Sequence, residues 1–509
     1  MVTTTTTPNV SSTAQKDYNI NEIWKFIRIS LIWMGIIFGA VWIVSWGVGA
    51  VVPSLIEEFT PDKKTGSMIA NIVRMLTPLI AVMVFIPINA TYMVLAERRG
   101  LALFTVRKGP NRVGPDGFLQ TAADAVKLLF KENIDPEGSD MLMFTLAPII
   151  FFAPSVFGAI PLLAAVTSNH ELFQIVNLPT GIFYVLAMSS IPVVGIVMGG
   201  WASNNKYSLV GGLRSAAQAI SYEIPLVMAV VTVCLLVGTL NVVDIAWLQN
   251  PVDLANANAV TADVDNLEAI KKWELLRGNS HLGQAIKDIG ISELGKFGLF
   301  NWNIFGGDTF TGFIQLAISA KYSAGELIVK AFLAVLLVIC SFLLCGLYLT
   351  GACAEINRIP FDLPEAESEL VSGYNTEYSG IRFAIFFLAE FTNLFIVSTI
   401  AVVLWFGGGS SPFPGEYYQA LVLDPLTLVF NQINGVLAKA HLPAILNAVT
   451  FSGAVWAIAK TYALVFFAIL VRGTLPRFRI DQLMDFGWKR LIPLALILLL
   501  AITYLKELI

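Results

Sequence analysis

The sequence predicts an all-α polytopic membrane protein with about nine transmembrane helices. Of its 509 residues, 56% are hydrophobic and only 13% are charged, and this charged share is about half that of a typical soluble domain. A soluble chain of this size would leave much of that apolar surface in water. Helices are expected because backbone groups in lipid need partners within their own segment, and no alternating β-barrel pattern is present.

Nine apolar runs are each long enough to cross the hydrocarbon core, which takes about 20 residues. The first run is too long for the apolar part of a signal peptide, and no small-residue cleavage pattern follows it, so no cleaved signal is expected. Residues 1–28 form a polar tail before it. The runs lie near Ile29–Val52, Ile69–Leu95, Met141–Val166, Gly181–Gly200, Ala216–Gly238, Leu327–Thr350, Phe383–Phe406, Leu446–Val471 and Leu491–Leu505.

The distribution of Lys and Arg predicts the orientation of these helices. Positive residues concentrate in the short loops on one side, above all between Arg98 and Lys131 and between Arg472 and Arg490. Cytoplasmic loops carry such an excess, so we expect the N-terminus in the cytoplasm and the C-terminus outside it. The long polar interval 241–323 is then an extracytoplasmic subdomain.

Composition and motifs exclude several kinds of function. A net charge of −4 gives no basic excess for binding nucleic acid. The four cysteines show no C-x-x-C spacing, and the three histidines fall in expected loops, so neither an iron–sulfur cluster nor a bound metal is predicted. No phosphate-binding motif is present. The chain is therefore expected to carry no redox centre or nucleotide of its own.

The first cytoplasmic loop, expected to begin at Glu97, combines a rigid turn with an amphipathic helix. Two Gly-Pro pairs and an asparagine make the turn, through Gly109, Pro110, Asn111, Gly114 and Pro115. The helix carries a polar stripe of Gln120, Asp124, Lys127 and Lys131. A helix lying on lipid headgroups and a docking surface for a soluble partner both fit this pattern. The ordered turn favours docking, because topology alone requires no such scaffold.

The loop from Glu355 to Arg382 is acidic although it lies on the positive side. Asp362, Pro364 and Glu365 form the typical start of a helix, with an acidic cap and a proline in the first turn. A solvated acidic helix is one interpretation, and a proton-handling or partner-facing carboxylate cluster is the other. The acids are Glu355, Asp362, Glu365, Glu367, Glu369 and Glu377.

Three charged residues fall inside predicted spans: Glu223, Glu390 and Lys460. A charge in the membrane costs roughly 2.5–3.5 kcal/mol on insertion scales, so water or a partner must compensate it. A structural ion pair between a glutamate and Lys460 is one explanation. Because two buried acids accompany an acidic loop, a hydrated proton path is the interpretation we favour.

Four stretches together carry a resemblance to a known family. From about Ile69 to the C-terminus, the chain resembles the membrane-embedded H subunit of respiratory complex I, the proton-translocating NADH–quinone oxidoreductase. The similar stretches are Glu97–Arg99 with Gly109–Pro115 and Lys127–Glu132, Ser203–Ser208 with Ser221–Glu223, Glu355–Arg358 with Pro360–Leu370 and Glu377–Gly380, and Leu475–Arg479 with Asp481–Leu483 and Trp488–Lys489.

The resemblance implies a place at the junction of the hydrophilic and membrane arms, in the inner (cytoplasmic) membrane. It implies quinone (ubiquinone or menaquinone) as a substrate in a shared site, and proton or sodium transport. Iron–sulfur cluster, flavin and NADH would belong to partner subunits: two peripheral subunits would complete the site, and small membrane subunits would lie alongside. Residues implied in the quinone chamber are Glu97, Arg98, Arg107, Arg112, Asp124, Lys127 and Lys131. Those implied in the proton path are Glu223, Glu355, Asp362, Glu365, Glu367, Glu369, Glu377, Glu390 and Lys460.

The same resemblance divides the chain into five parts. After the tail, residues 29–66 are an extra helix and outer loop that the family lacks, and 251–310 are an extracytoplasmic insertion; both are expected to lie away from the cytoplasmic motifs. The family core occupies 67–250, with the chamber loop 96–140, and 311–509, with the acidic loop 351–382. Two alternatives remain. An anchor subunit of a related membrane-bound hydrogenase would carry the same core, and a stand-alone secondary transporter would show an internal repeat, which we do not find.

Overall fold

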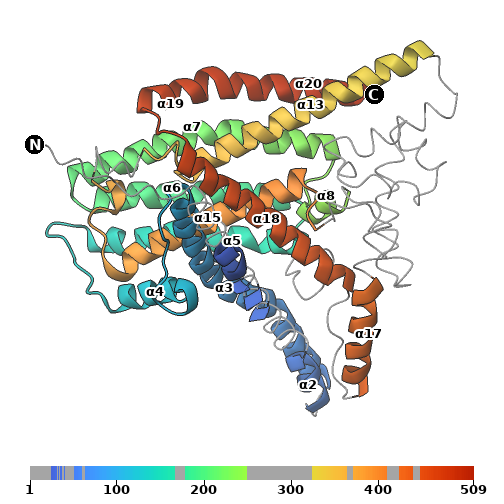
Figure 1. The fold of residues 1–509 in the computed structure, drawn as a ribbon, viewed down its shortest axis with the longest axis horizontal. Helices are drawn as coiled ribbons and strands as arrows, with labels where there is room; N and C mark the ends of the chain where they lie inside the picture. The colour runs from blue at the N-terminus through green and yellow to red at the C-terminus, as the bar shows by residue number, and fades with distance from the viewer. Residues whose placement is uncertain are drawn as a thin grey trace, which may run out of the picture.

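The computed structural model gives the part of the chain that can be described. It covers residues 24–30, 32–33, 35–36, 39–40, 51–59, 63–166, 178–248, 324–363, 371–409, 424–439 and 448–508. Within these residues the fold is entirely helical, and eight helices are long and apolar enough to cross a membrane. Figure 1 shows them as a bundle of long helices. The predicted all-α polytopic membrane fold is therefore confirmed.

The long helices form the bundle, and short ones lie at its ends. The long helices are α3 (Lys63–Phe104), α5 (Met141–Val166), α6 (Gly181–Ala202), α7 (Lys206–Val237), α13 (Ala324–Glu355), α15 (Gly380–Trp405), α18 (Ala448–Thr474) and α20 (Ile492–Leu508). The short ones are α2 (Val52–Phe59), α4 (Gln120–Phe130), α8 (Val242–Leu248), α17 (Asp424–Lys439) and α19 (Ile480–Phe486), with single turns η2 (Pro115–Gly117), η5 (Gly373–Asn375) and η7 (Gly487–Leu491).

Eight predicted spans coincide with helices, but several helices extend beyond them. Helix α3 runs on to Phe104, so Glu97 lies on a helix and not in a loop as expected, and α7 starts at Lys206, before the predicted Ala216. An apolar run marks only the part of a helix that lies in the hydrocarbon core of the membrane. The helix itself can continue through charged residues that face water or other protein. The ninth predicted span, 29–52, lies largely outside the described residues, as does the 251–310 insertion.

Helix α15 is the most deeply buried of the spans. It packs against α5, α18, α3 and α13, and its C-terminal residue Trp405 is completely buried. Helices α5, α6 and α7 approach closely at glycines. A Cβ atom at Gly195 of α6 would lie 2.8 Å from the backbone nitrogen of Phe151 on α5. Small residues at such contacts let helices pack in lipid, where no hydrophobic effect drives them together.

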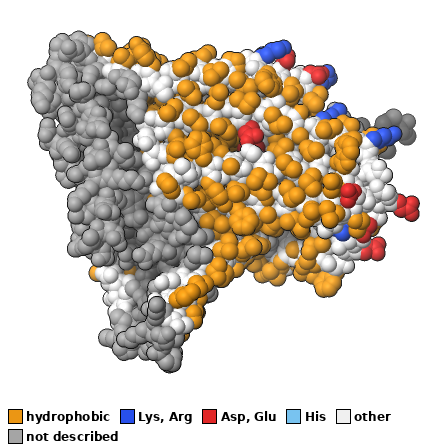
Figure 2. All heavy atoms as spheres, turned by 180° about the vertical axis from the view of Figure 1, so that it is seen from behind, with side chains coloured by type: hydrophobic (Ala, Val, Ile, Leu, Met, Phe, Trp, Pro, Cys, Tyr) orange, Lys and Arg blue, Asp and Glu red, His pale blue; other side chains and the backbone are white. Residues whose placement is uncertain are grey.

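The loops that carry the sequence motifs all join one end of the bundle. This is the end where α3, α6, α13 and α18 finish and where α5, α7 and α15 begin, at the left of Figure 1. Figure 2 shows a broad apolar band over the face seen from behind, with charged side chains at the edge away from the grey atoms and one acidic patch within the band. The chain is thus a multi-pass membrane protein with its motif loops gathered at one end.

Candidate functional site

Glu97 is the centre of a buried ionic cluster at the motif end. Its carboxylate accepts a hydrogen bond of 2.6 Å from Nη1 of Arg358, and both side chains are 9% exposed. Arg472, in the last turn of α18, donates to the other carboxylate oxygen. The Arg358 guanidinium also lies 4.4 Å from the centre of the Phe391 ring on α15. The cluster therefore joins α3, α15, α18 and the segment after α13.

Arg99, two residues further along α3, organises the predicted rigid turn. Its buried guanidinium donates to the Pro110 carbonyl at 2.9 Å and to the Asp116 carbonyl. Gly114 and Gly117 have φ of +73° and +75°, in the left-handed region that favours glycine. A Cβ atom at Gly117 would lie 2.2 Å from the Pro110 carbonyl oxygen. Arg99 and Gly117 were not among the predicted turn residues: Arg99 donates to two carbonyls of the turn, and Gly117 occupies a position with no room for a Cβ atom.

Helix α4 is attached to α3 through an ionic group. Asp124 accepts from Arg98 at 2.5 Å and from Lys127 at 3.3 Å. Burial alone would raise the pKa of Asp124, but the hydrogen bonds and positive charges of Arg98 and Lys127 outweigh it and hold that pKa below its ordinary value. These three predicted chamber residues are thus brought together, separately from Glu97.

The remaining predicted chamber residues face outward. Arg107, Arg112 and Lys131 are exposed and form no salt bridge with the described part of the chain. The apolar side of α4 is exposed too, and Phe130 at its end is 87% exposed. Both the cations and the apolar face are therefore open to something other than this chain.

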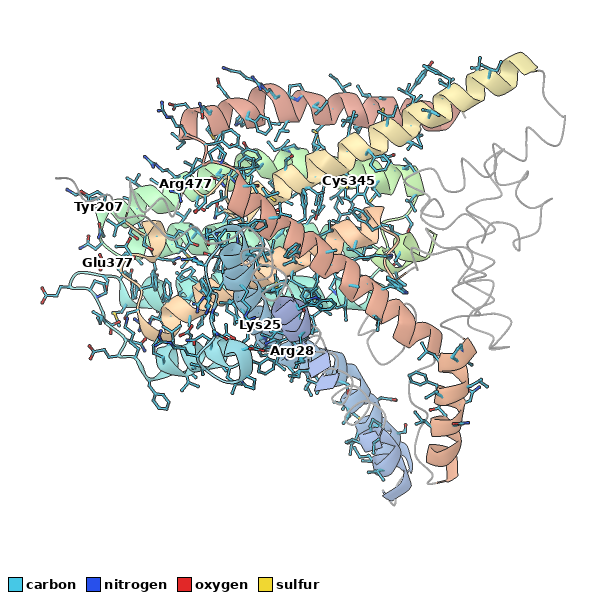
Figure 3. All side chains as sticks on the ribbon, in the orientation of Figure 1. Lys25, Arg28, Tyr207, Cys345, Glu377 and Arg477 are labelled. Atoms are coloured by element: carbon cyan, nitrogen blue, oxygen red, sulfur yellow. The ribbon has the colours of Figure 1, made fainter. Side chains whose placement is uncertain are left out.

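The structure describes the acidic loop up to residue 363 and again from residue 371. In the first part, Asp362 accepts a 3.1 Å hydrogen bond from Nη2 of Arg477. In the second part, Glu377 accepts from the Asn205 side chain at 2.6 Å, next to the start of α7. Figure 3 shows Glu377 and Arg477 at the motif end of the bundle. Glu365, Glu367 and Glu369, with the helix predicted to start at Asp362, lie outside the described residues.

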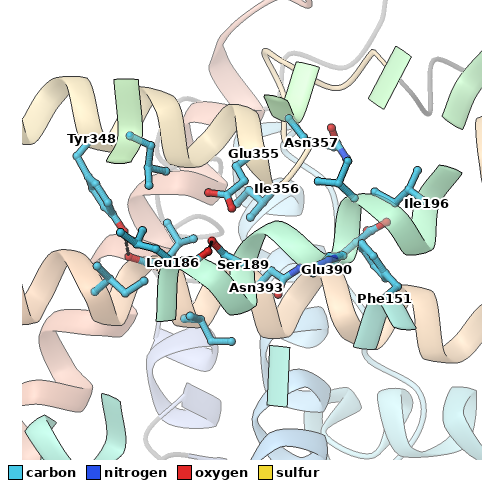
Figure 4. A pocket seen from close by; sticks show the side chains of 17 residues that line it. Phe151, Leu186, Ser189, Ile196, Tyr348, Glu355, Ile356, Asn357, Glu390 and Asn393 are labelled. Carbon is cyan, nitrogen blue, oxygen red and sulfur yellow. Dashed lines mark hydrogen bonds between the residues drawn. The ribbon is translucent and has the colours of Figure 1, made fainter. Parts of the chain in front are cut away.

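A small cavity lies within the bundle between α6, α13 and α15. Its volume is about 50 Å³, more than the ~10–15 Å³ that a single water molecule requires. Figure 4 shows Glu355, Glu390 and their neighbours around it. The polar lining residues are Ser189, Tyr348, Glu355, Asn357, Glu390 and Asn393. A site with this many polar partners can hold ordered water. No cluster of His, Cys, Asp or Glu in the described part suits a metal ion.

Two further contacts connect this cavity to its surroundings. Glu390 accepts a 3.0 Å hydrogen bond from the Tyr374 hydroxyl of η5. Glu223, on α7, accepts from Ser190, and its negative charge is close enough to Glu355 for the two to repel. Glu355 and Glu390 thus line one polar space, and Glu223 bonds to Ser190 on α6, beside the lining residue Ser189.

Lys460 is separate from that group. Its ammonium donates to the carbonyls of Phe406 at 2.7 Å and Gly408 at 3.0 Å, at the C-terminal end of α15. Glu390 lies about 24 Å back along the same helix, at ~1.5 Å per residue. A cation at a helix C-terminus compensates the partial negative charge of its last carbonyls.

Gln218 and Asn357, which were not predicted as site residues, hold the start of the acidic segment against α7. Gln218 is 1% exposed, and its Nε2 donates to the carbonyls of Ala354 at 2.8 Å and Phe361 at 2.7 Å. Asn357 donates to the Ser215 hydroxyl at 3.0 Å. The signal available was an uncharged polar run on one side of an otherwise apolar helix.

Comparison with known proteins identifies the family. The family model described as NADH dehydrogenase matches residues 77–264 and 310–503, well over half of the chain. This chain belongs to that family. Relatives named as the H subunit of NADH-quinone oxidoreductase include those of Brevibacillus brevis, 37% identical over 406 residues (80% of this chain, 85% of the relative), and Bacillus cytotoxicus, 37% identical over 419 residues (82% and 90%). The predicted family is confirmed, and the unmatched residues 265–309 fall within the predicted insertion.

Proposed function

We propose that this chain forms a wall of the quinone chamber and the first part of the proton path in an NADH–quinone oxidoreductase, of which it is a membrane-arm subunit. The electrons would come from an iron–sulfur cluster in a peripheral partner, since this chain has no redox centre in its sequence pattern. Two peripheral subunits would complete the chamber over the exposed cations Arg107, Arg112 and Lys131. The motif end would then face the cytoplasm.

One observation carries this proposal. The segment Glu355–Arg358 reaches the ionic cluster at one end and the polar cavity at the other. Arg358 pairs with Glu97 on the chamber side, whereas Glu355 and Asn357 line the cavity. A change of charge in the chamber is thereby joined to carboxylates inside the membrane through four consecutive residues.

Quinone reduction coupled to proton transport would use both the ionic cluster and the polar cavity. Reduction of a quinone to a quinol takes two electrons and two protons, and the residues of this chain would supply positions for the head group and for protons. The turn held by Arg99 gives the chamber a fixed wall. Because Glu355 and Glu390 line the same cavity, a proton bound at one carboxylate would change the electrostatic potential at the other. Water in the cavity would connect them.

The test is the variant Glu355→Gln in membrane vesicles that carry the intact complex. NADH-driven reduction of a short-chain quinone and acidification of the vesicle lumen are measured together. We expect acidification per quinone reduced to fall at least threefold, because a proton-carrying group in the lining of the cavity is lost. Glu137→Gln is the control, since Glu137 is an exposed acid in the loop between α4 and α5, away from the cavity. Equal coupling in both variants would contradict the proposal.

A further inference from the structure

The N-terminal helical segment, the described residues between 24 and 40, contacts the rigid turn of the chamber loop. It lies outside the residues that match the family, which begin at 77. Residues 1–28 are predicted to be a tail on the cytoplasmic side, and residues 29–66 are predicted to lie away from the cytoplasmic motifs. Arg28, the last residue of that tail, forms a salt bridge with Asp116. Trp33, in the predicted extra helix, stacks on Phe118, so this part of the helix does contact a motif loop. Figure 3 shows Arg28 close to α4.

We propose that this segment braces the chamber turn (residues 107–118), and that Trp33 and Arg28 are positioning residues for quinone binding. The inference rests on the proposed function, because it takes the turn to be a wall of the chamber. It assigns a role to a part of the chain that the family core lacks.

Trp33 provides the main contact of the brace. Its side chain is buried, at 7% exposed. Its ring lies 4.7 Å from the Phe118 ring with an angle of 25° between the planes, and 6.5 Å from the Tyr92 ring on α3. Phe118 is the last residue of the turn, so the stack fixes the point where the turn leads into α4.

Asp116 is held from two directions. Its backbone has φ of +52°, an unusual value for a residue other than glycine. Its carbonyl accepts from Arg99 on α3, and its carboxylate accepts from Arg28 on the N-terminal segment. Because the Arg28 side chain is 63% exposed, its salt bridge is expected to contribute less than the buried stack.

The segment has its own anchors in the bundle, independent of the turn. Ile29 is 3% exposed and belongs to the main hydrophobic core. The Phe26 ring lies 5.7 Å from that of Phe466 on α18. A substitution at Trp33 should therefore loosen the turn without detaching the segment. The turn is thus fixed to the bundle twice, by Arg99 from α3 and by Trp33 from the N-terminus.

The experiment compares Trp33→Ala, Trp33→Phe and Trp24→Ala in the intact purified complex. Trp24 is the matched control, since it lies in the same segment and is 66% exposed. Two quantities are measured: amide hydrogen exchange of residues 107–118, and KM and kcat for a short-chain quinone. NADH oxidation with a hydrophilic artificial acceptor serves to count assembled complexes.

For Trp33→Ala we expect exchange in the turn to rise about tenfold and KM to rise three- to tenfold, with kcat changed less than twofold. Trp33→Phe should restore both values, because a phenyl ring can still stack, and Trp24→Ala should match the wild type. Unchanged exchange in Trp33→Ala overturns the brace.

A variant of the turn itself separates this inference from the proposed function. Gly117→Ala disturbs the turn directly, because its Cβ atom has no room beside Pro110. If Gly117→Ala raises KM while Trp33→Ala leaves it unchanged, the brace is wrong and the chamber role stands. If neither variant alters KM although exchange rises in both, the turn is not a wall of the chamber, and both proposals fail there.

Discussion

Replacing Glu97 by glutamine tests the ionic cluster most directly. The wild-type carboxylate pairs with two guanidinium groups, of which that of Arg358 is 9% exposed and that of Arg472 is 31% exposed. Glutamine has nearly the same volume and still accepts one hydrogen bond, but it leaves two positive charges together. Removing one partner of a fully buried pair costs about 3–5 kcal/mol. Because Arg472 is partly exposed, we expect the lower end, about 3 kcal/mol.

That loss can be measured as a shift in the thermal unfolding midpoint of the purified complex. At ~2.1 cal/mol/K per residue, a chain of this length has an unfolding entropy of roughly 1 kcal/mol/K. A destabilisation of about 3 kcal/mol then lowers the unfolding midpoint of this chain by roughly 3 °C. The signal is best followed through a fluorophore attached to this chain, because other subunits unfold in the same range.

The matched control is Asp485→Asn. Asp485 pairs with Lys489 at 2.8 Å, but both side chains are more than half exposed, so its loss should cost no more than about 1 kcal/mol. A double-mutant cycle of Glu97→Gln with Arg358→Gln should give a coupling of about 2 kcal/mol, since the second change removes the unbalanced charge. Equal midpoints for Glu97→Gln and Asp485→Asn would refute the view that burial makes this cluster strong.

Two other predictions concern the outer parts of the site. Because the folded-state pKa of Asp124 lies below its unfolded value, its ionic attachment of α4 to α3 is fully present above about pH 4 and is lost as pH falls through that lower pKa. The rate of protease cleavage in α4 should therefore stay constant from pH 7 to about pH 5. Asp124→Asn should raise that rate across this whole range. A rise in the wild type already at pH 6 would disprove the view that Asp124 attaches α4 to α3. Lys460→Met should lower the unfolding midpoint by a few degrees, since it leaves the partial negative charge of the carbonyls at the end of α15 uncompensated. Acidification per quinone reduced should stay within twofold of the wild type. Loss of acidification with an unchanged midpoint would instead support a role of Lys460 in the proton path.

Much of the bundle was predictable because each membrane span is a continuous apolar run of the sequence. Met141–Val166 is both a predicted run and the observed helix α5. Helix ends were less predictable, since α3 continues through Glu97 into residues that were predicted to form a loop. Arg358 and Arg472 contributed to the orientation rule as positive charges, and nothing in their sequence positions indicates that both reach Glu97.

Pairing of this kind depends on how α3, α13 and α18 converge, which is a property of the tertiary fold. The same limit applies to Lys460. Its place in a span indicated a charge in the membrane but not that its ammonium donates to the carbonyls of Phe406 and Gly408 at the end of α15. The contact between Trp33 and Phe118 crosses a long stretch of sequence and has no local pattern. By contrast, the close approach at Gly117 belongs to a turn rich in glycine and proline, and there the sequence did indicate a fixed conformation.

The short connection after α13 has an electrical consequence. Asn357 adopts a left-handed conformation, with φ of +51°, and the amide of Arg358 bonds back to the Cys353 carbonyl at 3.1 Å, so the path from Arg358 to Glu355 is a stiff turn at most about 11 Å long. Two unit charges about 10 Å apart interact by roughly 1.7 kcal/mol at an effective dielectric constant of about 20. An energy of that size changes the occupancy of a proton site more than tenfold without any movement of atoms. The turn would then hold the two charges at a fixed separation. We therefore expect the backbone of residues 355–358 to keep its position when the complex is reduced.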